Sequence, residues 1–183
     1  MWSSLELAAL PIPLIDLIAR TCRDSFNACC APHQSLLNLQ GCLGKPGSGH
    51  RTVTKTPMLY RLTCREGTHR DTIRAWEKSI ALDQDSAKKG SSAKKAALKR
   101  CFYAELYTLC GFEAGANLFD FEKFFDLVDL PTLLDILNEK QYPLKHLVFA
   151  IQQHCAPRKL QVKNVTSTSV CPTNSILAGC FHS

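Results

Sequence analysis

Long hydrophobic runs are missing from this 183-residue sequence. No stretch approaches the roughly 18 consecutive apolar residues that a membrane-spanning helix needs, so we expect a soluble protein without a membrane partner. The most apolar stretch, residues 5–18, contains Glu6, Asp16 and two prolines and follows no basic residue. We therefore interpret it as part of the fold rather than as a signal peptide. An intracellular location, cytoplasmic or nuclear, is expected.

The spacings that mark zinc and redox sites are also missing. The chain has ten cysteines and six histidines, but no C-x-x-C and no H-E-x-x-H string. Neither a zinc enzyme nor a dense disulfide scaffold is favoured by this pattern. We expect reduced thiols that pack as small apolar side chains.

Acidic residues are scarce in the middle of the chain. The net charge is +6, and residues 45–100 contain 14 basic but only 5 acidic residues. Such a surplus indicates a partner that carries phosphate groups. A solvated helix face is an equally good interpretation for part of it, namely Lys88, Lys89, Lys94, Lys95 and Lys99.

Apolar periodicity and turn residues predict an α/β or α+β fold. Helices are expected over residues 5–26, 70–78, 93–109, 131–140 and 144–154. Extended segments are expected over residues 36–43, 51–56, 116–122 and 160–170. The glycine-rich stretch 41–51 should join the first two extended segments as a hairpin. Asp129 and Pro131 are typical of a helix start.

The string D-F-E-K-F-F-D at residues 120–126 resembles the first palm motif of reverse transcriptases, the polymerases that copy RNA into DNA. The resemblance implies that Asp120 is catalytic and binds magnesium, with Phe121 as a second metal-binding position. It also implies that Phe125 packs against the sugar of the incoming nucleotide. Two magnesium ions need hard oxygen ligands, which a carboxylate provides. The open alternative is the end of a strand with two surface carboxylates.

Two further segments resemble the same family in the same order. Residues 44–53, followed by P-M-L-Y-R-L, are similar to the fingers hairpin, where Lys45 and Arg51 would bind the triphosphate of the nucleotide. Thr52 replaces the usual proline. Residues 175–183 are similar to the start of the second palm motif, in which Gly179 would lie beside the nucleotide. An apolar strand with a glycine turn is the alternative for this last segment.

Together these segments imply a partial right-hand polymerase. Residues 1–115 would form a fingers-like region with a basic hairpin at 41–56, and residues 116–183 a partial palm. The closest resemblance is to reverse transcriptases of retrotransposons without long terminal repeats, with group II intron maturases as near relatives. The implied cofactor is Mg²⁺, and the implied partners are an RNA template, a DNA primer and deoxynucleoside triphosphates.

The family's Y-x-D-D string is missing, and no two aspartates are adjacent in the chain. We expect a sequence that ends before that string not to polymerise, because one motif carboxylate cannot hold two magnesium ions. Two alternatives to a polymerase fragment stay open. One is a non-catalytic nucleic-acid-binding remnant of a mobile element, and the other is a relic that fails to fold.

Overall fold

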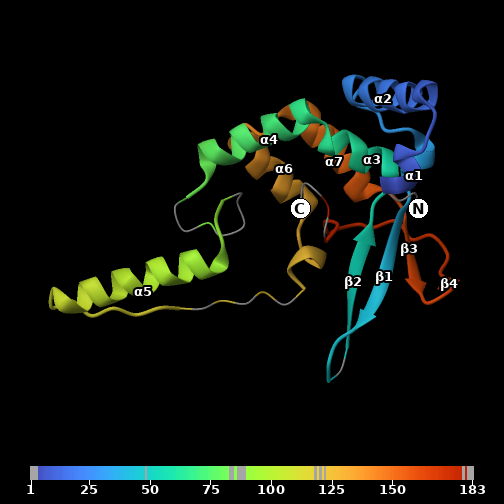
Figure 1. Ribbon diagram of the computed structural model, residues 1–183. Coiled ribbons are helices and arrows are strands. Elements are labelled where there is room, and N and C mark those ends of the chain that lie inside the picture. The colour runs from blue at the N-terminus through green and yellow to red at the C-terminus, as the bar shows by residue number, and fades with distance from the viewer. Residues whose placement is uncertain are drawn as a thin grey trace. The chain divides into compact units, whose positions relative to one another are not determined.

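The computed structural model describes residues 4–47, 49–82, 85, 90–117, 119, 121, 123–178 and 180. Over these residues the chain has a mixed α/β fold with seven α-helices and one four-stranded sheet (Figure 1). It divides into two compact units, the first made of residues 1–73 and 123–183 and the second of residues 74–122. Within the described ranges, no helix combines the length and the apolar character that crossing a membrane requires.

The helices lie close to the predicted positions, except that α3 (Met58–Arg65) was not predicted. In the first unit they are α1 (Ser4–Ala8), α2 (Ile12–Asn27), α3, α6 (Leu130–Glu139) and α7 (Leu144–Cys155), with 3₁₀ turns η1 (His33–Ser35) and η2 (Phe124–Asp126). The boundary between the units falls inside α4 (Gly67–Ile80), and α5 (Ala93–Leu109) belongs to the second unit. The single helix predicted over residues 5–26 is divided at Pro11, because proline lacks the N–H that a continuous helix needs.

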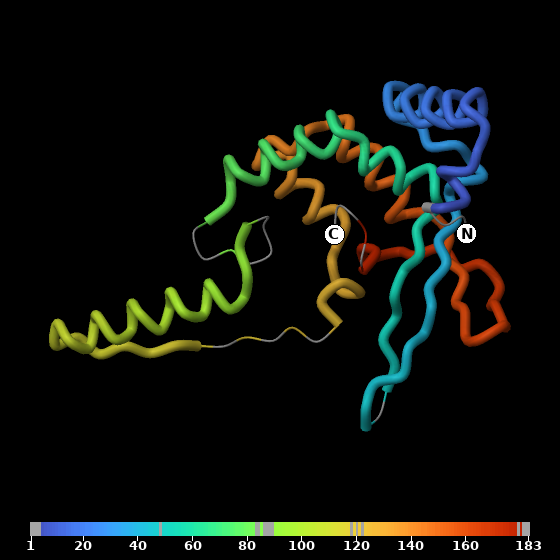
Figure 2. The backbone as a smooth tube through the Cα atoms, viewed as in Figure 1, coloured from blue at the N-terminus to red at the C-terminus, as the bar shows by residue number. Residues whose placement is uncertain are grey.

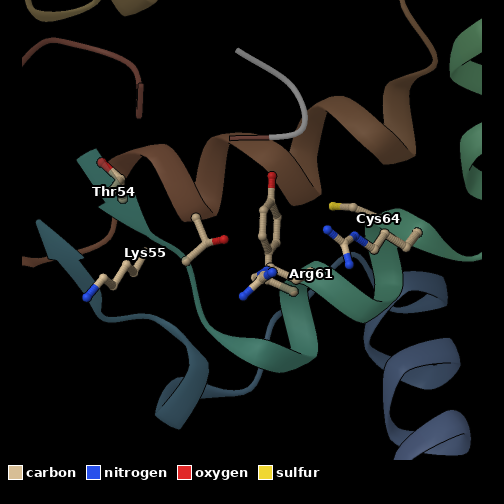
Figure 3. A pocket seen from close by; sticks show the side chains of 7 residues that line it. Thr54, Lys55, Arg61 and Cys64 are labelled. Atoms are coloured by element: carbon tan, nitrogen blue, oxygen red, sulfur yellow. The ribbon is translucent and has the colours of Figure 1, made fainter. Parts of the chain in front are cut away.

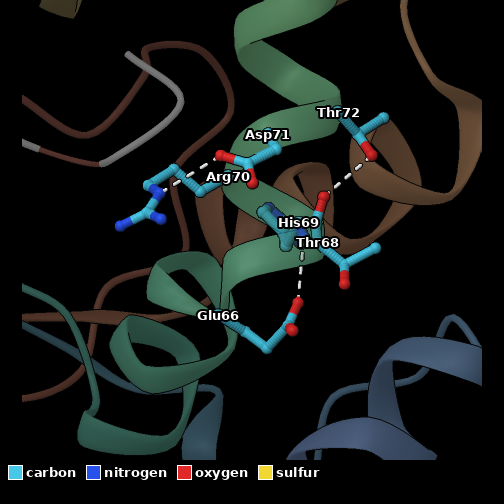
Figure 4. A network of polar contacts seen from close by, with 6 residues as sticks. All are labelled: Glu66, Thr68, His69, Arg70, Asp71 and Thr72. Atoms are coloured by element: carbon cyan, nitrogen blue, oxygen red, sulfur yellow. Dashed lines mark hydrogen bonds and ion pairs between the residues drawn. The ribbon is translucent and has the colours of Figure 1, made fainter.

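Side-chain caps explain where several helices begin. Ser92 Oγ accepts a hydrogen bond from the Lys95 amide at 3.1 Å and starts α5. Asp129 Oδ2 accepts from the Thr132 amide at 3.0 Å and starts α6, as predicted. Glu66 Oε2 accepts from the His69 amide at 2.9 Å in the first turn of α4 (Figure 4). The carboxylate of Glu66 thereby satisfies a backbone donor of that turn.

The sheet has the strand order β2-β1-β3-β4. Strands β1 (Asn38–Gly44) and β2 (His50–Lys55) form the antiparallel hairpin that the glycine-rich stretch predicts. Strand β3 (Arg158–Val162) runs parallel to β1, and β4 (Val165–Thr166) returns antiparallel to β3. Because parallel neighbours need a crossover, the long connection between β2 and β3 carries the helices α3 to α7.

The strand predicted over residues 116–122 is wrong for the residues there that the structure describes. Residues 116, 117, 119 and 121 have no regular secondary structure and pair with no strand of the sheet. A strand is stabilised by its partners, and a short apolar run in the sequence does not supply them.

The core of the first unit lies between α3, α7 and the C-terminal segment 175–183, of which the structure describes residues 175–178 and 180. Tyr60 and Phe149 stack with ring centroids 5.4 Å apart, and Phe26 of α2 meets Phe149 edge to face. Leu177 and Cys64 are fully buried in the same cluster. The C-terminal segment is therefore part of the packed core rather than a tail over it.

Buried polar side chains fix the position of β1 and β3 against α7. Asn38 Nδ2 donates to the carbonyl of Gln153 at 2.9 Å, and Gln153 Nε2 donates to Asn38 Oδ1 at 2.6 Å. Arg158 donates to Ser175 Oγ at 2.6 Å and to the carbonyl of His154 at 3.0 Å. These bonds satisfy groups that would otherwise be buried without partners.

Candidate functional site

The turn of the β1–β2 hairpin presents the two cations that the sequence singles out. The Lys45 amide donates to the carbonyl of Gly49 at 3.1 Å, and Arg51 pairs across the strands with Leu43. Gly47 and Gly49 have φ of 93° and 89°, a conformation that favours glycine. Lys45 and Arg51 are exposed, and the structure brings both to the turn end of one hairpin, which points away from α2 and α3 (Figure 2).

One face of β2 continues this cationic surface toward the base of the hairpin. Because alternate residues of a strand share a face, Arg51 and Lys55 lie on one side of β2, with Val53 between them. Four residues of strand separate their Cα atoms by about 13 Å. Lys55 is exposed and Val53 is 41% exposed. The face is thus open to a partner along its length.

The C-terminal segment connects β2 to the end of the 120–126 string. The Thr54 amide donates to the carbonyl of Ala178 at 3.4 Å, and the Ile176 amide donates to the carbonyl of Phe125 at 2.9 Å. The Ser175 amide donates to the carbonyl of Val128 at 3.0 Å. The two segments that resemble palm motifs therefore meet through backbone hydrogen bonds, and the second also bonds to Thr54, the residue directly after the segment 44–53 that resembles the fingers hairpin.

Phe125 contributes the backbone carbonyl that accepts the hydrogen bond from Ile176. It belongs to η2, its ring meets Phe124 edge to face at 5.5 Å, and its side chain is 38% exposed. Lys123, which precedes η2, has a left-handed φ of 52° and turns the chain there. The backbone of Phe125 is therefore fixed by its hydrogen bond to Ile176, while its ring remains partly accessible. An aromatic side chain that contacts a ligand needs both.

Asp120, on which the predicted metal site depends, is not among the residues that the structure describes. Gly179 also lies outside the described residues, and Phe121, which is 71% exposed, offers only its carbonyl oxygen as a ligand. Within the described residues no three His, Cys, Asp or Glu side chains gather closely enough to hold a metal ion. These residues do not by themselves provide the oxygen ligands that two Mg²⁺ ions need, and we derive no step through magnesium.

A cationic cavity at the base of the hairpin was not predicted from the sequence. It has a volume of about 410 Å³ and lies between the end of β2 and α3 (Figure 3). Its lining consists of Thr54, Lys55, Thr56, Tyr60, Arg61, Cys64 and Arg65. The signal that could have found it is the spacing of Arg61 and Arg65, four residues apart on one helix, shortly after Lys55.

The titratable groups on the floor of this cavity are neutral at pH 7. Burial raises the pKa of Tyr60 well above its usual value, and the neighbouring Cys180 and Cys64 raise it further. Burial raises the pKa of Cys64 to about 12, with Cys180 adding to the effect. The Tyr60 hydroxyl and Cys180 Sγ lie 3.1 Å apart. The charge of the lining therefore comes from Lys55, Arg61 and Arg65 alone.

The sequence matches no protein-family model, and a search of curated proteins finds no match.

Proposed function

We propose that this chain is the fingers and first part of the palm of an RNA-directed DNA polymerase, and that its own activity is to bind nucleic acid through the β1–β2 hairpin without polymerising. One observation supports the proposal most. The Phe125 carbonyl and the amide of Thr54, which directly follows segment 44–53, are both hydrogen-bonded to residues 176–178, so the two segments that resemble palm motifs meet beside the base of the hairpin.

The hairpin supplies the binding chemistry in this proposal. Lys45 and Arg51 are exposed at its turn and Lys55 at its base. Arginine binds phosphate oxygens with two parallel hydrogen bonds, and lysine adds a compact positive charge. The exposed ring of Phe125 would stack on a base or sugar of the bound strand. An RNA template, a DNA primer and deoxynucleoside triphosphates all carry the required phosphate groups, and an intracellular location fits such partners.

The second candidate is a non-catalytic nucleic-acid-binding remnant of a mobile element. It is favoured by the exposed cations Lys45, Arg51 and Lys55, which can bind phosphate without a metal ion. The two candidates share the hairpin but differ at position 120. If Asp120→Asn weakens the magnesium-dependent binding of a deoxynucleoside triphosphate, the polymerase fragment gains; if it leaves every property of the chain unchanged while Lys45→Ala and Arg51→Ala weaken RNA binding, the purely binding function gains.

Fluorescence anisotropy with a labelled single-stranded RNA tests the proposed binding. We expect Lys45→Ala and Arg51→Ala each to weaken binding and to reduce the slope of log K against log salt by about 0.7, the value for one lost phosphate contact on a single strand. Arg20→Ala removes an exposed cation of α2 and serves as the matched control. Equal effects of all three substitutions would contradict a site at the hairpin.

Primer extension with magnesium, template-primer and deoxynucleotides tests the expected lack of polymerisation. We expect no extended product from the purified 183-residue chain. Templated product would show that the chain supplies a complete set of metal ligands, contrary to the proposal.

A further inference from the structure

The cavity between β2 and α3 is separate from the hairpin turn and has its own chemistry. None of its seven lining residues is acidic, and three of them are cations. Its volume of about 410 Å³ lies in the range of small-molecule sites, which is roughly 300–1,000 Å³. A cavity of this size and charge selects an anion.

The cations approach the cavity from two different elements. Lys55 ends β2, whereas Arg61 and Arg65 lie one turn apart on α3. Only Thr56 and Pro57 separate the strand from the helix, and Pro57 fixes the chain at φ −57°. In Figure 3, Thr54 and Lys55 lie on the β2 side, Cys64 on the α3 side, and Arg61 between them. This short connection holds the positive charges in place before any ligand arrives.

Neutral donors complete the lining. Thr54 is 8% exposed, and its hydroxyl accepts from Gln40 Nε2 at 3.5 Å while keeping its own proton to donate. Thr56 contributes a second hydroxyl. Among the described lining residues the one aromatic ring, that of Tyr60, is 2% exposed because it stacks on Phe149 in the core, so it offers no open face on which a base could stack. The set of donors matches phosphate oxygens rather than a nucleobase.

From this arrangement we propose that the cavity is a phosphate-binding site in which Arg61 and Arg65 bind the phosphate oxygens and Lys55 neutralises the remaining charge. The site goes beyond the proposed function, because its two arginines belong to α3; of its cations it shares only Lys55 with the hairpin, and it stands whether or not Lys45 and Arg51 bind RNA. The phosphate belongs either to a nucleic-acid backbone or to a free polyphosphate, and the chemistry of recognition is the same for both.

Isothermal titration calorimetry with inorganic pyrophosphate at low salt is the first test. We expect Arg61→Gln and Arg65→Gln each to weaken binding at least fivefold, and Arg61→Lys, which keeps the charge but loses the paired hydrogen bonds, to have a smaller effect. Arg20→Gln, at an exposed position of α2, should change the affinity less than twofold. Circular dichroism and the Tm of each variant show that the fold is intact, and Lys55→Gln tests the same cavity from β2 should a substitution in α3 prevent folding.

A labelled single-stranded RNA distinguishes the two sources of phosphate. If Arg61→Gln and Arg65→Gln also reduce the salt slope of RNA binding, the bound phosphate belongs to a backbone; if they affect pyrophosphate alone, it belongs to a free polyphosphate. Affinities for both probes that match those of Arg20→Gln would overturn the site. The proposed function is tested separately by loss of RNA binding in Lys45→Ala and Arg51→Ala, because neither residue lines the cavity.

Discussion

His69 and His146 form a buried pair at the contact between α4 and α7. Their ring centroids are 4.2 Å apart, and Phe26 meets both rings edge to face. Burial lowers the pKa of His69 to about 4, His146 lowers it further, and Glu66 opposes the shift. Burial also lowers the pKa of His146. Both imidazoles are therefore neutral in the folded chain at pH 7.

This pair predicts a loss of stability in mild acid. Between pH 6.5 and about 4 the unfolded chain binds protons on His69 that the folded chain does not, so the free energy of unfolding falls as the pH falls through that window. We expect His69 to account for on the order of 2 kcal/mol. Urea unfolding of His69→Phe across this range should show a shallower pH dependence than the wild type. His33→Gln, at an exposed position, is the control, and an unchanged slope in His69→Phe would refute the assignment.

The bonds between Asn38 and Gln153 predict a stability effect that depends on which partner is removed. Asn38→Leu leaves Gln153 buried with unsatisfied groups, so we expect a loss of about 2 kcal/mol in urea unfolding. The double variant Asn38→Leu/Gln153→Leu removes both side chains and should lose less than the sum of the single variants. Additive losses would mean that the two side chains contribute independently.

The positions of individual site residues could be predicted only where a local sequence pattern indicates them. The glycine-rich turn placed Lys45 and Arg51 at a hairpin end, because turn residues and alternation are local signals. Arg61 and Arg65 were missed, since a cavity arises only when α3 packs beside the end of β2. Position 125 was singled out by resemblance, and its backbone contact with Ile176 depends on packing that no local pattern specifies.

At the scale of elements, capping residues and periodicity predicted the positions of helices better than they predicted which side chains are buried. The helix over residues 93–109 is confirmed as α5, but its apolar side chains are not packed as the periodicity indicates. Leu98, Phe102 and Leu106 are 70%, 60% and 46% exposed. Periodicity reports which residues share a face, whereas burial needs a partner surface, and none covers these side chains among the described residues.

The start of α6 carries a prediction at this scale. Asp129 accepts from both the amide and the hydroxyl of Thr132, and these bonds lower the pKa of the Asp129 carboxyl. Asp129→Ala should lower the Tm by about 2–4 °C at pH 7, the size of a lost helix cap in a chain of this length. The difference should shrink in acid, because a protonated carboxyl is a weaker acceptor. Asp135→Ala on the same helix should leave the Tm within about 1 °C. Equal effects of the two substitutions would contradict the cap.

For the whole molecule, the sequence predicted the mixed α/β class, which is confirmed, but not the way the chain closes on itself. Residues 175–178 pack between β2 and the turn that contains Phe125, and Leu177 is fully buried there. The backbone hydrogen bonds of this segment to Val128, Phe125 and Thr54 join positions 47 to 124 residues apart, so no local sequence pattern predicts them. The assignment to a polymerase fragment stays a proposal that the meeting of these segments supports.

The final prediction concerns the positive charge of the whole chain. It distinguishes RNA binding at a defined site from general attraction of RNA to the net charge. Lys45, Arg51 and Lys55 belong to the first unit, whereas Lys94, Lys95 and Lys99 belong to α5 in the second. Changing either set to glutamine removes three positive charges, so any effect of net charge alone is the same. We expect the hairpin set to reduce the salt slope of RNA binding by about 2 and the α5 set by less than about 0.5. Equal reductions would mean that RNA is attracted by the overall charge, and a larger reduction from the α5 set would place the nucleic-acid-binding surface on the second unit.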